Sequence, residues 1–166
     1  MLYPRITGSG LGAHYLFLIH IIYKDKPTEM SQNANQLQIR VYYEDTDAGG
    51  IVFYANYLKF FERARTEWLR RLGIHQSTMA QTEQQLFVVK QADIEYLKSA
   101  KLDDLLTIRS RITHLGGASI RFAQEAWRED DLLCQSQIVV VCVDSHTMRA
   151  TKINPHLRSI LEKAQD

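Results

Sequence analysis

The clearest periodic pattern in the chain lies between residues 55 and 72. Apolar residues recur there three and four positions apart and gather on one side of a helical projection, with charged residues opposite. This pattern predicts an amphipathic helix that Asn56 or a neighbour caps and that Gly73 ends. Arg65 falls inside the apolar arc, so we expect its charge to reach solvent or to pair with Glu62. The apolar arc contains Tyr57, Leu58, Phe61, Ala64, Trp68, Leu69 and Leu72, with Phe60 at its edge.

A strand and an acidic turn are predicted just before this helix. Residues 41–43 are β-branched or aromatic, which is typical of a strand. Three carboxylic acids follow between residues 44 and 47, and then come Gly49 and Gly50. The two glycines allow a sharp turn or the close approach of another group to the backbone.

The chain after the helix reads as a series of strands joined by tight turns. Gly116 and Gly117 are typical of a hairpin, and no helix as strong as the first separates the strands. Hairpin connections make a sheet antiparallel, so the pattern predicts an α+β fold with one long helix on a curved antiparallel sheet. The expected strands are 86–97, 105–108, 119–127 and 132–143, and a short helix is expected over 154–163.

Length and composition fit one ordinary globular domain. The chain has 166 residues, is 45% hydrophobic and carries a formal net charge of +1. This charge gives no electrostatic reason to expect a nucleic acid or anionic membrane partner. We place the domain at residues 35–166 and read 1–34 as an N-terminal extension, disordered or a misassigned start. Its apolar run, 15–23, is too short to span a bilayer.

The cysteines and histidines suggest neither a disulfide nor a metal site. Cys134 and Cys142 on one strand would be about 27 Å apart, too far to pair. Their even spacing directs both to one apolar face, as expected of buried thiols in a reducing compartment. The six histidines lack metal-ligand spacing, so we expect no metal and no cofactor.

The acidic turn has two interpretations. A carboxylate just before a helix lies near unpaired N–H groups and the positive end of the helix dipole. A carbonyl held by those groups would be polarised, and Asp47 could attack it or activate a water molecule. Alternatively, Asp45 and Asp47 only shape the turn, which is the commoner role of short acidic residues before helices.

A family resemblance favours the catalytic interpretation. The segment YYEDTDAGGIVFYANYLKFFERARTEWL resembles the signature of tol-pal-associated acyl-CoA thioesterases, in the hydroxybenzoyl-CoA thioesterase branch of hotdog-fold proteins. The resemblance continues through LFVVKQADIEYLKSAKLDDLLTI and IVVVCVD. It implies that Asp47 is the catalytic carboxylate and that the amide of Tyr54 binds the thioester oxygen. It also implies that the substrate lies against Gly49, Gly50, Ile51, Val52 and Tyr57.

One residue departs from that family pattern. Many members have a histidine where this chain has Tyr54, so a proton-shuttling imidazole is absent. The hydroxybenzoyl-CoA relatives carry tyrosine there, which fits a mechanism without histidine. The change affects the expected rate and acyl preference rather than the reaction class.

The resemblance implies hydrolysis of acyl-CoA or acyl-carrier-protein thioesters by a cytoplasmic homodimer or homotetramer. Basic residues for coenzyme A phosphates are few near the 116–117 hairpin, where Arg111, His114 and Arg121 lie. A carrier-protein thioester is therefore an open alternative. A second alternative is a non-catalytic hotdog scaffold that binds acyl carrier protein or envelope-biogenesis partners. A dehydratase on the same fold is disfavoured, because the motif holds no histidine.

Overall fold

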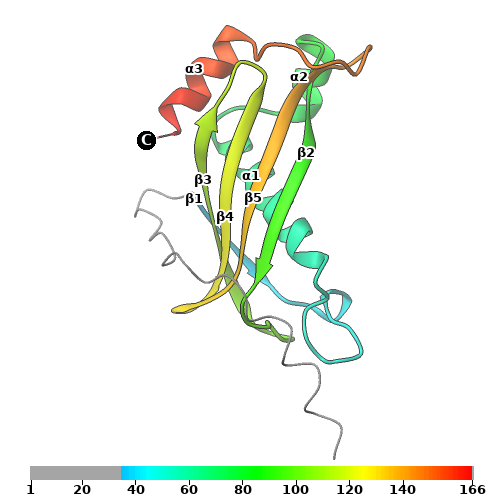
Figure 1. Ribbon diagram of the computed structural model, residues 1–166, viewed down its shortest axis with the longest axis vertical. Helices are drawn as coiled ribbons and strands as arrows, with labels where there is room; N and C mark the ends of the chain where they lie inside the picture. The colour runs from blue at the N-terminus through cyan, green and yellow to red at the C-terminus, as the bar shows by residue number, and fades with distance from the viewer. Residues whose placement is uncertain (1–34, 166) are drawn as a thin grey trace, which may run out of the picture.

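The computed structural model describes residues 35–165 and contains a five-stranded antiparallel sheet (Figure 1). The strands lie in the order β1-β3-β4-β5-β2, so β1 and β2 form the two edges. Residues 1–34, where we predicted an extension, lie outside the described residues. The elements are β1 (Asn35–Arg40), α1 (Asn56–Arg71), α2 (Gln76–Thr82), β2 (Gln85–Tyr96), β3 (Leu105–Leu115), β4 (Ser119–Arg128), β5 (Asp131–Asp144) and α3 (Pro155–Lys163).

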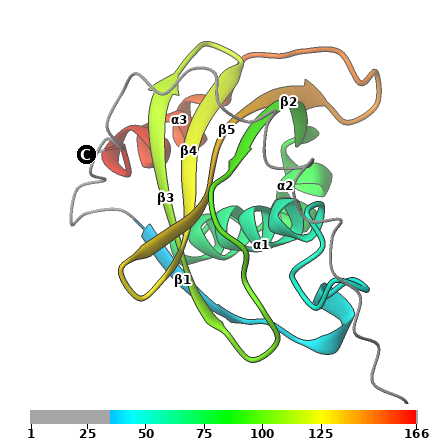
Figure 2. The same ribbon diagram turned by 60° about the horizontal axis from the view of Figure 1, so that its bottom comes forward.

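The long helix α1 lies along one face of the curved sheet (Figure 2). Its buried side chains include Phe60, Phe61 and Trp68, so most of the predicted apolar arc meets the sheet, but Leu58 is 41% exposed. Gly73 ends the helix in the left-handed conformation, with φ of 81°. A side chain would be strained there, which explains why glycine suits this position. The α+β prediction is confirmed.

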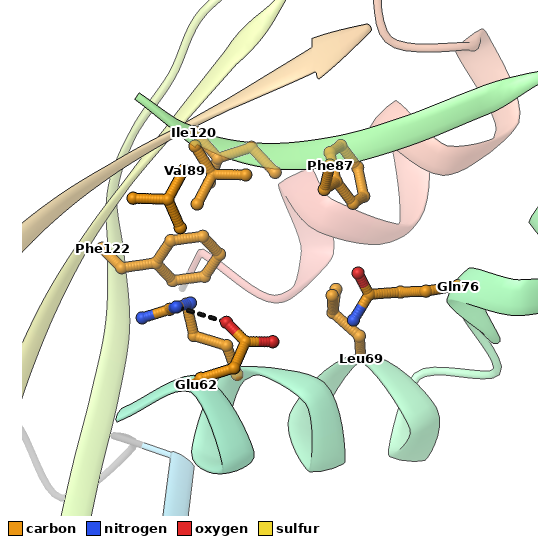
Figure 3. A pocket seen from close by; sticks show the side chains of 9 residues that line it. Glu62, Leu69, Gln76, Phe87, Val89, Ile120 and Phe122 are labelled. Carbon is orange, nitrogen blue, oxygen red and sulfur yellow. Dashed lines mark hydrogen bonds and ion pairs between the residues drawn. The ribbon is translucent and has the colours of Figure 1, made fainter. Parts of the chain in front are cut away.

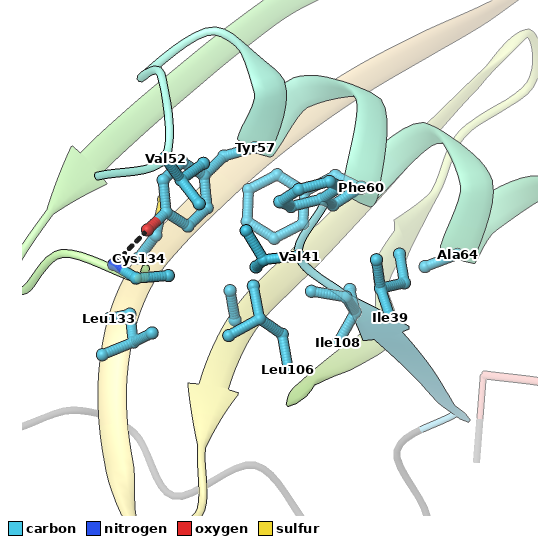
Figure 4. Close-up of a cluster of buried hydrophobic side chains, with 13 residues drawn as sticks. Ile39, Val41, Val52, Tyr57, Phe60, Ala64, Leu106, Ile108, Leu133 and Cys134 are labelled. Carbon is cyan, nitrogen blue, oxygen red and sulfur yellow. Dashed lines mark hydrogen bonds between the residues drawn. The ribbon is translucent and has the colours of Figure 1, made fainter. Parts of the chain in front are cut away.

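The core divides along α1 into two clusters. The first lies under the first half of α1 and contains Val41, Phe60, Leu106 and Leu133 (Figure 4). The second lies under the end of α1, where Trp68 packs edge-on against Phe122 with ring centroids 6.0 Å apart. Burying large apolar side chains is the main favourable term in folding, at roughly 1.5–3 kcal/mol for each. These two clusters therefore fix α1 on the sheet.

The sheet after α1 follows the predicted series of strands, except that β3 continues to Leu115 where we expected a strand over 105–108 only. The β3–β4 hairpin turns at the two predicted glycines, where the Gly116 N–H donates to the Ser119 carbonyl at 2.7 Å. Cys134 and Cys142 are free, buried and on the same strand, as expected. The terminal helix begins at Pro155, and the Asn154 side chain caps it by accepting from the His156 N–H at 2.7 Å.

Three local predictions were wrong. The first strand is Asn35–Arg40, and residues 43–45 form a 3-10 turn where we expected strand 41–43. The helix Gln76–Thr82 was not expected, because only Met79 of its residues is buried and the apolar pattern is weak. Ala55 is the N-cap of α1 and makes no side-chain cap, while Asn56 lies inside the helix.

Candidate active site

The acidic turn folds into a short hairpin just before α1. Thr46 and Val52 pair across it, and the Asp47 N–H donates to the Ile51 carbonyl at 2.9 Å. The turn closes where the Gly50 N–H donates to the Asp47 carbonyl at 2.9 Å. Gly50 has φ of 74°, a conformation that side chains rarely adopt. Gly49 and Gly50 therefore form the exposed tip of this hairpin, next to Asp47.

A second carboxylate anchors the hairpin. Asp45 is buried, and its Oδ2 accepts from the Tyr42 N–H at 3.0 Å. Its backbone carbonyl accepts from the Phe53 N–H at 2.8 Å and from the Asn56 side-chain amide at 3.1 Å. Asp45 and Asn56 together tie the hairpin to the first turn of α1. The turn-shaping role that we considered for both aspartates thus fits Asp45.

Asp47 is in a different environment. Its side chain is exposed, and only its Oδ1 is engaged, by the Gly49 N–H at 2.8 Å. A Cβ on Gly49 would lie 3.0 Å from that same oxygen, so glycine allows the bond. Within residues 35–165 no group donates to Oδ2. Asp47 therefore presents one oxygen to solvent while the other fixes its orientation.

The start of α1 offers an N–H group. The Asn56 N–H donates to the Phe53 carbonyl at 2.9 Å, whereas the Tyr54 N–H donates to no backbone carbonyl in the described part of the chain. The Tyr54 N–H lies one residue before the N-cap Ala55, next to the first N–H groups of the helix, which have no partner within it and carry its positive dipole end. Tyr54 itself is 62% exposed. This amide is chemically able to stabilise a developing oxyanion.

Tyr96, which the sequence did not single out, holds this position from the end of β2. Its hydroxyl donates to the Tyr54 carbonyl at 3.1 Å, and the two rings meet edge-on with centroids 6.4 Å apart. No local signal marks this role, because Tyr96 lies 42 residues away and reads only as an aromatic strand residue. Tyr96 thus holds the Tyr54 peptide from the sheet.

The other predicted substrate-binding residues lie deeper. Val52 and Tyr57 are buried in the first core cluster, and Ile51 is half-buried and pairs with Lys101. The Tyr57 hydroxyl accepts from the Ala100 N–H at 3.2 Å (Figure 4). Burial raises the pKa of Tyr57 to about 12, so its phenol stays neutral. Within one chain, these residues support the hairpin from below and Asp47, Gly49, Gly50 and Tyr54 form its surface.

A cleft opens farther along α1, between the helix and strands β2, β4 and β5 (Figure 3). Its volume is about 340 Å³, counting the open mouth. Glu62, Arg65 and Gln76 give it a polar wall. Apolar side chains complete the lining, namely Leu69, Phe87, Val89, Ile120, Phe122 and Val140.

The described residues give no sign of a metal centre or a membrane span. Across residues 35–165, no group of three or more histidine, cysteine or acidic side chains could hold a metal ion. No helix in this part of the chain is long and apolar enough to cross a bilayer.

Known proteins resemble this chain in sequence and fold. Residues 49–135 match the model of the thioesterase superfamily. The chain is 47% identical over 120 residues to "Acyl-CoA thioesterase YbgC" of Haemophilus influenzae, which covers 72% of this chain and 88% of that protein. The chain belongs to the thioesterase superfamily, in its YbgC group. The hotdog fold expected from the resemblance is therefore confirmed, and the chain is a thioesterase.

Other members of the superfamily agree with this assignment. "Long-chain acyl-CoA thioesterase FadM" of Escherichia coli is 34% identical over 130 residues, covering 77% of this chain and 97% of FadM. Among solved structures, a probable thioesterase from Bartonella henselae has a TM-score of 0.70 and 32% identity. That match covers 73% of this thioesterase and 99% of the Bartonella chain.

Proposed function

We propose that this thioesterase hydrolyses acyl-CoA thioesters at the hairpin before α1, with Asp47 as the catalytic carboxylate. The observation that supports this most directly is the pairing of an oriented, accessible carboxylate with a helix start whose Tyr54 N–H has no backbone acceptor. The names of the YbgC and FadM relatives support acyl-CoA as the substrate class.

The proposed reaction has two parts. The Tyr54 N–H polarises the thioester carbonyl and stabilises the negative charge that develops on its oxygen. Asp47 either attacks the carbonyl carbon, giving an anhydride that water then cleaves, or removes a proton from a water molecule that attacks. Gly49 and Gly50 let the thioester approach the backbone closely, since neither places a side chain over the tip. The products are the free acid and coenzyme A thiol.

The proposal includes assembly into a homodimer or homotetramer through the edge strand β2. This strand pairs with β5 alone among the described elements, and seven of its twelve residues are exposed. Tyr96 is 43% exposed, which is high for an aromatic strand residue. An unpaired edge invites pairing with another strand, and a second copy would cover it. Such a partner would also supply walls to the active site.

The experiment compares wild-type enzyme with Asp47→Asn across short, long and aromatic acyl-CoAs. Loss of the carboxylate should lower kcat at least about 100-fold, within the range for general acid–base groups. Asp130→Asn, in the exposed β4–β5 turn, is a matched control that should keep full activity. Circular dichroism establishes that both variants are folded. Wild-type-like turnover by folded Asp47→Asn would refute the catalytic assignment.

Two finer parts of the proposal concern the carrier and the compartment. A carrier-protein thioester would serve the same chemistry, because the reacting group is identical. We place the enzyme in the cytoplasm, consistent with its free, buried cysteines. Hydrolysis at background for every acyl-CoA would instead support the carrier-protein thioester or the non-catalytic scaffold.

A further inference from the structure

The cleft between α1 and the sheet contains a buried arginine with spare hydrogen-bond donors. Arg65 is 6% exposed, and its Nη1 donates to the Gln124 Oε1 at 2.6 Å. Its Nη2 donates to the Glu62 carboxylate, as the dashed line in Figure 3 marks. A guanidinium carries five N–H groups, so three find no acceptor among residues 35–165. Burial lowers the pKa of Arg65, but Glu62 opposes that change and the charge is kept.

An acceptor faces the same cleft. The Gln76 Nε2 donates to the Thr66 Oγ1 at 3.1 Å, which fixes the orientation of the amide. Its Oε1 accepts no hydrogen bond from the described residues and points toward the side of Phe87 in Figure 3. The cleft thus offers donors from Arg65 and an acceptor from Gln76, between apolar walls.

The cleft lies on the path from the proposed site. Leu58 and Glu62 are four residues apart on α1 and share one side of the helix, and Tyr54 lies in the turn just before the helix. Leu58 is 41% exposed and Val89, at the mouth of the cleft, is 53% exposed. An apolar chain could therefore run from the start of α1 over Leu58 into the cleft.

The distance sets the length of that chain. Glu62 lies six residues after Asn56, the first residue of α1, which is about 9 Å along the helix axis at 1.5 Å per residue. The tight turn from Tyr54 to Asn56 adds about 3–4 Å. An extended chain advances about 1.2 Å per bond, by comparison with an extended backbone. About ten carbons therefore separate a carbonyl at the helix start from the polar wall.

We propose that this cleft binds the distal end of the acyl group and selects chains of about ten carbons that carry a hydroxyl there. The inference rests on the proposed function, which it deepens. A hydroxyl both accepts and donates, so it can meet Arg65 and Gln76 together. A distal carboxylate fits less well, because Glu62 already balances the charge of Arg65 and would repel a second anion. An unsubstituted chain would displace water from these polar groups without giving them a partner, which is costly.

The test measures kcat/KM for decanoyl-CoA, 3-hydroxydecanoyl-CoA and 10-hydroxydecanoyl-CoA, each relative to butyryl-CoA. The wild-type enzyme should prefer the 10-hydroxy substrate over the other two by about tenfold. Gln76→Leu should reduce that preference by about three- to tenfold, the size of one hydrogen bond. Gln137→Leu, an exposed glutamine on β5, is the matched control and should leave the preference unchanged.

A second pair of variants tests the path itself. Val89→Phe narrows the mouth and should lower kcat/KM for all three ten-carbon substrates relative to butyryl-CoA. Val88→Phe, which adds the same bulk at the neighbouring position on the opposite face of β2, should not. Equal rates on the three ten-carbon substrates, or a preference for the 3-hydroxy isomer, would overturn the inference and leave the proposed function standing. No hydrolysis even of butyryl-CoA would overturn both.

Discussion

The buried polar network around Arg65 gives a sharp test of what holds α1 on the sheet. Gln124 is fully buried on β4 and links this strand to α1 and β3. Its side chain accepts from Arg65 on α1 and donates to the Phe61 carbonyl on α1 and to Ser110 on β3. Gln124→Met keeps the length of the side chain and removes all three hydrogen bonds. A bond to a charged group contributes about 1.5–3 kcal/mol and a neutral one about 0.5–1.5 kcal/mol. We therefore expect the free energy of unfolding to fall by about 3–5 kcal/mol.

The double variant separates this network from general packing. Gln124→Met alone leaves the buried Arg65 guanidinium without its partner, whereas Arg65→Met/Gln124→Met removes the guanidinium as well. The loss of unfolding free energy in the double variant should therefore be about 1–3 kcal/mol smaller than the sum of the two single losses. Glu62 then loses its partner but remains largely solvated, with its side chain 53% exposed. The stability effects of the Arg65 and Gln124 substitutions should therefore be coupled rather than additive.

Urea unfolding followed by circular dichroism measures these differences, at one protein concentration for all variants because assembly would otherwise change the apparent stability. Gln124→Met should shift the midpoint by at least about 1 M, given slopes of about 1–3 kcal/mol per molar urea. Gln137→Leu on exposed β5 surface should shift it little. Losses that simply add in the double variant, or a loss below about 1 kcal/mol for Gln124→Met, would refute the reasoning.

Two further predictions concern the sheet. Burial raises the pKa of Glu125, against the lowering effects of a bond from the Trp127 indole and of nearby Arg109 and Arg111. The folded state thus favours the protonated acid, and this stability is present below the unfolded pKa of about 4.3 and is lost as pH rises through the folded value. Glu125→Gln should therefore raise the urea midpoint at pH 7 and have little effect near pH 4; a lower midpoint at pH 7 would mean that the arginines dominate. For the edge strand β2, light scattering of the purified chain should give the mass of a dimer or tetramer, and a monomer at micromolar concentration would contradict the proposed assembly.

Periodicity predicted the elements whose patterns are long and locally consistent. The helix Asn56–Arg71 and the strands β2, β4 and β5 lie close to their predicted bounds, whereas β3 (Leu105–Leu115) continues for seven residues beyond the predicted 105–108. Periodicity did not predict the 3-10 turn, because side-chain hydrogen bonds to the backbone there take the place of strand pairing. The Asp45 carboxylate accepts from the Tyr42 N–H, and the Thr46 hydroxyl donates to the Tyr43 carbonyl at 2.9 Å. Such short-range bonds override the strand preference of tyrosine and valine.

The candidate site was predictable only where its residues are neighbours in the chain. Asp47, the two glycines and Tyr54 lie within eight residues, so a family signature can contain them all. The partner that Arg65 finds in Gln124 lies 59 residues away, and Tyr96 lies 42 residues from Tyr54. Only the register of the sheet brings such residues together, and a single sequence does not fix that register. The pairing of Arg65 with Glu62 was expected and is confirmed, since it spans one helical turn.

The hydrogen bond from the Tyr96 hydroxyl to the Tyr54 carbonyl links the margin of the sheet to the turn where the chemistry is proposed. Tyr96 is the last residue of β2, the strand with its outer edge uncovered. A change in the conformation of that end of the strand would therefore be transmitted to the turn before α1 through Tyr96. Assembly through β2, as proposed, would therefore couple the quaternary structure of the protein to its catalytic rate.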